Sequence, residues 1–418
     1  MRHRLKIIRP GWRSMIILLS ITLSLALSTD VRAEEPYDLG VALGFTGTGA
    51  TYSKDAVDGI KLAVDQINAK GGLLGKHPIR LHVADTQTNP GVAFVETKKL
   101  IEQHNVKAVI GTYSSAAALA IKPLCLEKCV LHIATISNSE DITKIDFSPY
   151  TYSVVPNTYM QAKAVALGVA KVAKEKRWAT YCTIASDYTW GRSTQELTVQ
   201  FLKELVPNFK LAHAFWPPLG EKNFVGYIAS VYSYKPDCLI GSIAGEDNAE
   251  FMRQARLADD LFKKIPYPGS LISVIELMDQ AKTIERGMIG LTRAPFFAHM
   301  DVPRMADFVK SFRDKYDRYP SDWAVLSYDG VHVLRQGIEK AGTLEDSGRA
   351  ALKGMKVQTT RGELFFREVD NQLSCSSYIG VVTDDPRYPF PIYGNLMEFK
   401  GPDTWRPEQE ILAARGRQ

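Results

Sequence analysis

The sequence predicts an α/β protein made of two doubly wound lobes, each a parallel sheet with helices on both faces. Strand-like and helix-like segments alternate strictly over residues 38–258. The alternation restarts near residue 158, after an extended junction at 148–157. The chain of 418 residues, 45% hydrophobic and 23% charged, is ordinary in composition for a globular protein and long enough for two domains.

The first run of elements lies between residues 38 and 134. Four apolar residues recur at helical spacing over 57–67, and the glycine pair at 71–72 ends that helix. Pro90 opens the next helix. The expected strands are 38–45, 79–84, 106–110 and 130–134, and the expected helices are 52–70, 90–104 and 114–127.

The second run and a mixed third segment follow. The tail from Asp384 is rich in Pro, Tyr and charged residues, and we expect it to wrap the surface. The expected strands are 178–185, 209–215, 237–243, 363–367 and 376–383, and the expected helices are 158–174, 190–205, 222–232, 246–258, 302–318 and 322–341.

The first 33 residues are arranged as a secretory signal. Residues 1–14 are basic, Met15 to Leu27 are mostly apolar, and Ala33 ends a suitable cleavage site. The apolar run is shorter than the roughly 20 residues of a membrane span, and an uncleaved anchor is the alternative. We therefore expect a signal peptide at 1–33, a periplasmic location and a mature chain that begins at Glu34.

The net charge of +5 belongs to that segment. It holds six of the 51 basic residues and one of the 46 acidic residues, so the rest of the chain is balanced. A balanced chain lacks the basic surface of a nucleic-acid-binding protein, and we expect no nucleic-acid partner.

The five cysteines are too few for a disulfide scaffold. Export makes oxidation feasible, and Cys125 and Cys129 are close enough for a possible disulfide if the chain bends between a helix and a strand. The alternative is that both are small buried hydrophobic residues.

Motifs for enzymes and cofactors are missing from the sequence. Gly44, Gly47 and Gly49 follow the first strand, but Tyr52 stands where a dinucleotide-binding motif starting at Gly47 needs its third glycine. No H-E-x-x-H, no zinc-spaced Cys/His cluster and no G-x-S-x-G occurs. We expect a binding protein that is not an enzyme and that uses no cofactor or metal.

Polar residues follow several predicted strands, where the cleft of an open α/β sheet lies. Ser114 and Ser115 open a helix; either one caps it, and the same helix start suits an anionic ligand group. The segment 136–138 is a polar turn or a neighbour of Ser115. Trp190 is a core residue or a stacking wall, and Asp247 is a first-turn helix acid or a charge for the ligand.

Several segments share one family pattern. They are GFTGTGATYS, DAVDGIKLAVDQINAKGGLLGKHPIRLHVAD and KLIEQHNVKAVIGTYSSAAALAI, followed by SDYTWGRS, KPDCLIGSIAGEDNAEFMRQA, FVKSFRDKYDRYPSDWAVLSYDGVHVLRQGIEKAG and TTRGELFF. Together they resemble the periplasmic branched-chain amino acid-binding family, the type I solute receptors of ABC importers. The resemblance covers nearly all of the mature chain.

The resemblance implies two Rossmann-like lobes joined by a three-strand hinge, the type I periplasmic binding protein architecture. The ligand binds between the lobes, which close on it. The crossovers are expected near 153–157, 291–295 and 372–377. Lobe 1 is then 34–155 plus 294–374, and lobe 2 is 156–293 plus 375–418, including the C-terminal tail.

The resemblance also implies ligand contacts. In family members that bind amino acids, a Ser at the position of Ser115 holds the ligand carboxylate, and groups at the positions of Ile136 and Asn138 complete that hook. Tyr52 matches an aromatic residue beside the ligand, and Trp190 matches one that covers it. The full expected set is Tyr52, Ser114, Ser115, Ile136, Ser137, Asn138, Trp190, Asp247 and Leu271.

One departure concerns the ligand. Amino acid binders of the family place an acid against the ligand ammonium, and Leu271 occupies that position. A buried ammonium without a partner is strongly unfavourable, so we expect a carboxylate that lacks an α-ammonium.

The expected function is the substrate-binding component of an ABC importer, monomeric, with permease subunits of the inner membrane as its partners. The alternatives are a receptor for amides or urea, and a sensing module for a membrane signalling partner.

Overall fold

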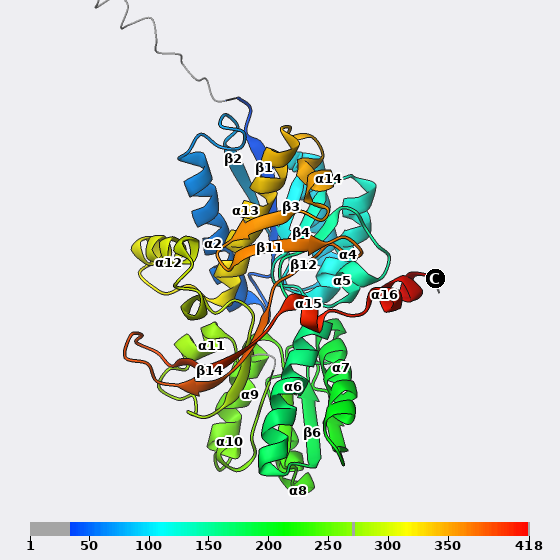
Figure 1. Ribbon diagram of the computed structural model, residues 1–418, viewed down its shortest axis with the longest axis vertical. Helices are drawn as coiled ribbons and strands as arrows, with labels where there is room; N and C mark the ends of the chain where they lie inside the picture. Colours follow the sequence, from blue (N-terminus) through cyan, green and yellow to red (C-terminus); the bar gives the residue numbers. More distant parts are fainter. Residues whose placement is uncertain (1–33, 270–271, 417–418) are drawn as a thin grey trace, which may run out of the picture.

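Two α/β lobes are stacked along the long axis of the molecule (Figure 1). The computed structural model describes residues 34–269 and 272–416. The first lobe is built on an eight-stranded sheet and the second on two three-stranded sheets. Gly269 joins these two smaller sheets, because it bridges Gly241 on one side and Gly290 on the other. The predicted α/β class is confirmed.

The sheet of the first lobe has the strand order β10-β11-β12-β5-β4-β3-β1-β2. From β2 to β12 all pairs are parallel, whereas β10, β11 and β12 pair antiparallel. Strands β1, β3 and β4 are buried almost throughout, as expected when helices cover both faces. The bounds are β1 (Tyr37–Leu43), β2 (Ile79–Asp85), β3 (Ala108–Gly111), β4 (Leu131–Ala134), β5 (Thr151–Ser153), β10 (Lys356–Thr359), β11 (Gly362–Arg367) and β12 (Gln372–Leu373).

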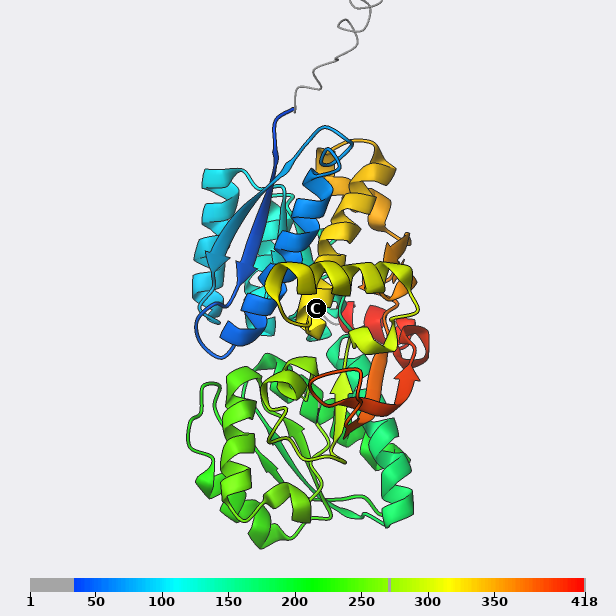
Figure 2. The ribbon, with the colours of Figure 1, turned by 90° about the vertical axis from the view of Figure 1, so that its left-hand side faces the viewer.

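The helices of the first lobe come from both ends of the chain. Helix α2 lies beside α13, a helix from late in the sequence (Figure 2). The helices are α2 (Ala50–Asn68), α3 (Pro90–His104), α4 (Ser115–Glu127), α5 (Asp141–Lys144), η1 (Phe296–Ala298), α12 (Pro303–Tyr316), α13 (Asp322–Ala341), η2 (Glu345–Gly348) and α14 (Arg349–Leu352).

The second lobe holds a parallel sheet of order β7-β6-β8 and an antiparallel sheet of order β14-β13-β9. Its strands are β6 (Thr180–Ala185), β7 (Lys210–Phe215), β8 (Cys238–Ser242), β9 (Ile289–Thr292), β13 (Ser377–Thr383) and β14 (Ile392–Phe399). Its helices are α6 (Thr158–Lys176), α7 (Thr189–Leu205), α8 (Val225–Tyr234), α9 (Gly245–Leu257), α10 (Leu261–Lys264) and α11 (Val274–Asp279).

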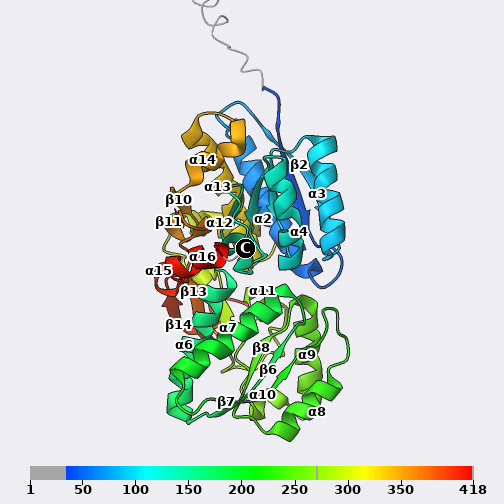
Figure 3. The ribbon, with the colours of Figure 1, turned by 90° about the vertical axis from the view of Figure 1, so that its right-hand side faces the viewer.

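The chain passes between the two lobes after β5, after β9 and after β12. Figure 3 shows α4 of the first lobe and α7 and α11 of the second lobe on either side of the boundary. The largest apolar cluster lies in the first lobe and continues across this boundary to Trp190 and Val274. Side chains of both lobes therefore meet at the carboxyl ends of the parallel strands.

The C-terminal segment is more regular than the sequence predicts. We expected a surface tail from Asp384, but the structure forms β14, α15 (Gly401–Thr404) and α16 (Glu408–Arg415) there. Residues 356–359 also form a strand that the sequence pattern did not indicate. The lobe boundaries that the resemblance implies stay a prediction.

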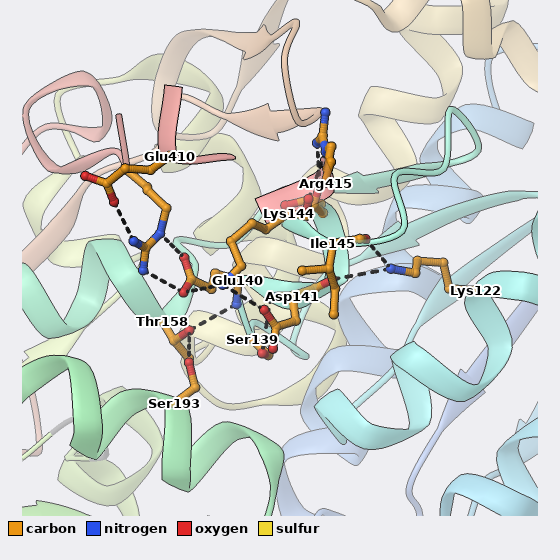
Figure 4. Close-up of polar contacts among 12 residues, drawn as sticks. Lys122, Ser139, Glu140, Asp141, Lys144, Ile145, Thr158, Ser193, Glu410 and Arg415 are labelled. Atoms are coloured by element: carbon orange, nitrogen blue, oxygen red, sulfur yellow. Dashed lines mark hydrogen bonds and ion pairs between the residues drawn. The ribbon is translucent and has the colours of Figure 1, made fainter. Parts of the chain in front are cut away.

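The last part of the chain, the C-terminal clasp (residues 400–416), packs on α6 of the second lobe and on α5 of the first, and Figure 4 shows its contacts near α5. Arg406 donates two hydrogen bonds to the carboxylate of Glu140, with N···O distances of 2.7 and 2.8 Å. The same guanidinium lies 4.2 Å from the ring centre of Tyr159 on α6. Arg415 donates to two backbone carbonyls of α5. The clasp therefore joins α6 of the second lobe to α5 of the first.

The possible disulfide between Cys125 and Cys129 is not formed. Both residues are free thiols; Cys125 is buried in the apolar cluster beneath α4, whereas Cys129 is exposed. The chain leaves the helix through a left-handed conformation at Cys129, with φ of 54°. The turn therefore directs the two side chains into different environments.

Candidate functional site

A small cavity lies between the two lobes. The end of β3, the loop after β4 and the start of α2 line it from the first lobe, and the starts of α7 and α9 line it from the second. The lining residues are Tyr52, Tyr113, Ser115, Ile136, Ser137, Asn138, Tyr188, Trp190, Ala244, Arg293 and Trp323.

Two neighbouring serines at the start of α4 have different positions. Ser114 is the N-cap, and its side chain accepts a hydrogen bond from the amide of Ala117. The Oγ of Ser115 accepts from the amides of Asn138 and Ser139, at 3.3 and 3.1 Å. Ser115 therefore joins the helix start to the loop after β4 and lines the cavity, whereas Ser114 does not.

The loop after β4 is held by its own polar groups. The hydroxyl of Thr112 donates to the Oγ of Ser137 at 3.1 Å. The Nδ2 of Asn138 donates to the carbonyl of Ile136 at 2.9 Å. The Oδ1 of Asn138 is buried and accepts no hydrogen bond from a residue that the structure describes.

Five aromatic rings form most of the wall. Tyr52 stacks on Trp323 at 5.3 Å between ring centres and meets Tyr113 edge-on at 5.8 Å. Tyr188 and Trp190 form a second pair, at 6.1 Å, on the side of the second lobe. The indole nitrogens of Trp190 and Trp323 are buried and donate to no described residue.

Arg293 brings a positive charge to the cavity. It follows β9, is fully buried and lies over the ring of Trp323 at 5.0 Å. Its Nη2 donates to Oε1 of Gln161 at 2.6 Å, which ties it to α6. Burial lowers the pKa of Arg293, and the carboxylate of Asp322 opposes that shift. Arginine nonetheless stays protonated in proteins.

A buried acid stands behind the aromatic wall. The hydroxyl of Tyr52 donates to Glu276, whose other oxygen accepts from the amide and the hydroxyl of Ser273. Burial raises the pKa of Glu276 to about 7, and the hydrogen bonds from Ser273 and Tyr52 limit the rise. Glu276 does not line the cavity.

The expected site residues are brought together in part. Tyr52, Ser115, Ile136, Ser137, Asn138 and Trp190 line the cavity, and Ser114 caps α4 behind it. Asp247 is not among the lining residues: its carboxylate accepts from the amide of Gly220 at 2.6 Å and from Lys222 at 3.2 Å, so it secures the loop before α8. Leu271 lies outside the described residues.

Five lining residues were not expected from the sequence: Tyr113, Tyr188, Ala244, Arg293 and Trp323. Tyr113 adjoins Ser114, and Tyr188 lies two positions before Trp190. Both tyrosines could therefore have been expected from the same strand ends as Ser114 and Trp190. Arg293 lies in the expected crossover 291–295, and its place between the lobes could have indicated it as a site residue, whereas no sequence motif did. Trp323 begins a helix far along the chain, and no local pattern connects it to the other residues.

The described residues give two further negative findings. No group of three or more described His, Cys, Asp or Glu side chains is arranged to hold a metal ion. None of the helices within 34–269 and 272–416 has the length and apolar character needed to cross a bilayer.

Comparison with known proteins identifies the family. The model of a family described as periplasmic binding protein matches residues 36–386. A Leu/Ile/Val-binding protein homolog 8 of Brucella abortus is 35% identical over 366 residues, which cover 83% of this chain and 88% of the relative.

Two solved structures are similar in fold. One is a solute-binding protein of an ABC transporter from Rhodopseudomonas palustris in complex with 3,4-dihydroxybenzoic acid, with a TM-score of 0.77, 20% identity, and 88% and 98% of the two chains covered. The other is a leucine-binding protein of Thermotoga maritima, with a TM-score of 0.74, 21% identity, and 86% and 98% covered. The chain therefore belongs to the periplasmic binding protein family.

Proposed function

We propose that the solute is a small aromatic carboxylate without an α-ammonium group. The observation that carries the proposal is the composition of the cavity wall: five aromatic rings and one buried guanidinium surround it. Residues of both lobes line the cavity, so a ligand held there would contact both.

The charge of the lining residues favours an anionic ligand over a zwitterionic one. Arg293 is the one charged side chain among the described lining residues. The acids near Arg293 are engaged by other groups: Asp322 accepts from the hydroxyl of Thr292 and the backbone amide of Arg293, and Glu276 binds Tyr52 and Ser273. A buried ammonium near Arg293 would meet repulsion from the guanidinium, and no described lining residue would give it a carboxylate, which is strongly unfavourable.

The aromatic rings favour a flat apolar body. Aromatic pairs gain roughly 0.5–1.5 kcal/mol beyond the burial of their area when they stack or meet edge-on. Proteins of similar fold bind both benzoate-type acids and leucine, so the fold leaves the choice open; the aromatic residues of the cavity wall support a benzoate-type acid.

The remaining parts of the function belong to the same proposal. The precursor is cleaved after Ala33, and the mature monomer delivers its ligand unchanged to the permease subunits of an importer in the inner membrane. The membership of the family and the order of basic, apolar and small residues in 1–33 support this.

Calorimetry with the mature protein tests the ligand class. We expect benzoate or a close analogue to bind and leucine, isoleucine and valine to give no heat. Replacing Arg293 with Gln should weaken the carboxylate by roughly 1.5–3 kcal/mol, the range for hydrogen bonds to charged groups. The control is Arg387→Gln, because Arg387 is exposed and paired locally with Asp385. Micromolar binding of leucine with aromatic carboxylates silent would contradict the proposal.

A further inference from the structure

We infer that the ligand also carries an uncharged hydrogen-bond donor, a hydroxyl or a carboxamide, which faces Asn138 while the carboxylate faces Arg293. This inference rests on the proposed function and adds the polarity with which the ligand lies in the cavity. It is carried by the buried polar groups of the cavity wall that still offer a hydrogen bond.

The corner formed by Ser115 and Asn138 offers one donor and one acceptor. Because the Oγ of Ser115 accepts from two backbone amides, its own hydrogen is left to donate. The Nδ2 of Asn138 is bound to the carbonyl of Ile136 at 2.9 Å, which fixes the orientation of the amide. Its Oδ1 is therefore a true acceptor, on a side chain only 4% exposed, with no described partner.

A carboxylate fits this corner poorly. It would bring an anionic oxygen against the Oδ1 of Asn138, where two acceptors face each other and neither gains a hydrogen bond. A hydroxyl or a carboxamide can donate to Asn138 and accept from Ser115 at once.

Three other lining residues, Arg293, Trp323 and Trp190, offer donors. The guanidinium of Arg293 lies over Trp323, and the indole nitrogens of Trp323 and Trp190 are donors without a described acceptor. Trp323 is 1% exposed and Trp190 is 4% exposed, so bulk water has little access to hydrogen-bond with their indole nitrogens. Charge-assisted donors of this kind match the two oxygens of a carboxylate.

The experiment compares three ligands that share one ring: benzoate, 4-hydroxybenzoate and 4-carbamoylbenzoate. Calorimetry on the intact mature protein should show the hydroxyl or the carboxamide ligand binding at least about tenfold more tightly than benzoate, because only they satisfy the Oδ1 of Asn138. Terephthalate, with a second carboxylate in place of the donor, should bind more weakly than either.

Three variants locate the two ends of the ligand. Asn138→Leu removes the acceptor and should bring the donor-bearing ligand to the affinity of benzoate. Ser115→Ala should weaken the donor-bearing ligand more than benzoate, whereas Arg293→Gln should weaken both by the same factor. The matched control is Asn223→Leu at an exposed position, which should leave the ratio between the ligands unchanged.

Each contrary result has a separate meaning. Equal affinities of the wild type for benzoate and both donor-bearing analogues overturn this inference and leave the proposed function standing. A loss of benzoate binding in Ser115→Ala, with Arg293→Gln unaffected, reverses the orientation and also overturns it. Failure of every aromatic carboxylate to bind overturns the proposed function, and the inference with it. Because Asn138→Leu also breaks the bond to Ile136, its thermal unfolding is compared with wild type, and Ser115→Ala supplies the independent measure.

Discussion

At the scale of single residues, adjacent side chains of the same type differ in what they support. Ser114 caps α4 through the amide of Ala117, whereas Ser115 binds the loop after β4 and lines the cavity. We expect Ser114→Ala to lower the free energy of unfolding by about 1 kcal/mol and leave the affinity for ligand unchanged. Thermal unfolding and calorimetry on the same samples check this.

Ser115→Ala is the matched partner of that variant. It removes both the acceptor for two backbone amides and the donor to the ligand, so affinity should fall roughly tenfold. Equal affinities of the two variants would show that Ser115, like Ser114, only supports the helix start.

Glu276 makes stability depend on pH. Burial raises its pKa to about 7 from an ordinary 4.5, so the native state holds a proton that the unfolded chain releases. The free energy of unfolding therefore falls as pH rises from about 4.5 to about 7, by about 3 kcal/mol, and stays low above that range. Urea unfolding at pH 5 and pH 8, followed by tryptophan fluorescence, measures the difference.

In Glu276→Gln this part of the pH dependence should disappear, because glutamine does not titrate. Glu127→Gln is the control, since Glu127 is exposed on the surface. A pH profile in Glu276→Gln that matches wild type would show that another group carries the effect.

Apart from Tyr52 on α2, which the family resemblance supplied, the expected residues that line the cavity follow strands. Ser115, Asn138 and Trp190 lie just past strand ends, and topology alone brings those ends to one edge. Trp323 reaches the cavity through the packing of α13 on α2, a contact between distant segments that local spacing cannot encode. Asp247 was also expected because it follows a strand, but its carboxylate binds Lys222 and the amide of Gly220, and it does not line the cavity.

At the scale of elements, the C-terminal clasp is the part with the most testable role. Glu140 follows the loop that carries Asn138, and its carboxylate is held by Arg406 and Lys144. We expect Arg406→Met to lower the free energy of unfolding by roughly 1–3 kcal/mol, because it leaves a mostly buried carboxylate with one partner fewer.

The same variant should release ligand faster, since the loop beneath the cavity loses a support. Stopped-flow fluorescence of the tryptophans measures the dissociation rate. Arg387→Met, in an exposed local pair, is the control. An unchanged dissociation rate in Arg406→Met would show that the clasp does not influence ligand binding.

The regular elements differ in how well the sequence indicates them. Helices such as α3 and α13 begin at caps that can be read directly, namely Asn89 with Pro90 and Ser321. Strand β14 could not be predicted, because prolines and charges surround it and its pairing with β13 supplies the order. Short elements such as α5 also depend on tertiary contacts, since four residues cannot sustain a helix alone.

At the scale of the whole molecule, the mature protein should begin at Glu34. Residues 1–33 carry the basic, apolar and small residues of a secretory signal in the usual order. Mass spectrometry of the periplasmic fraction should show Glu34 at the N-terminus. Recovery of the full-length chain in the membrane fraction would instead indicate an uncleaved anchor.

Lobe closure should be visible as stabilisation. A ligand that binds only the native state at one hundred times its Kd adds about 2.7 kcal/mol to the free energy of unfolding. Both lobes contribute to one cavity, so their unfolding transitions should rise together when 4-hydroxybenzoate is added. A shift in only one transition would place the ligand within a single lobe.

The packing of α13 on α2 has a consequence for the order of folding. Helix α2 is among the first segments synthesised, yet its partner arrives only after nearly all of the second lobe has been made. Contacts between such distant segments form slowly, because a long loop must close before they can stabilise anything. During synthesis the apolar face of α2 therefore lacks its partner until α13 has been made, and we expect this face to stay open to chaperones until then.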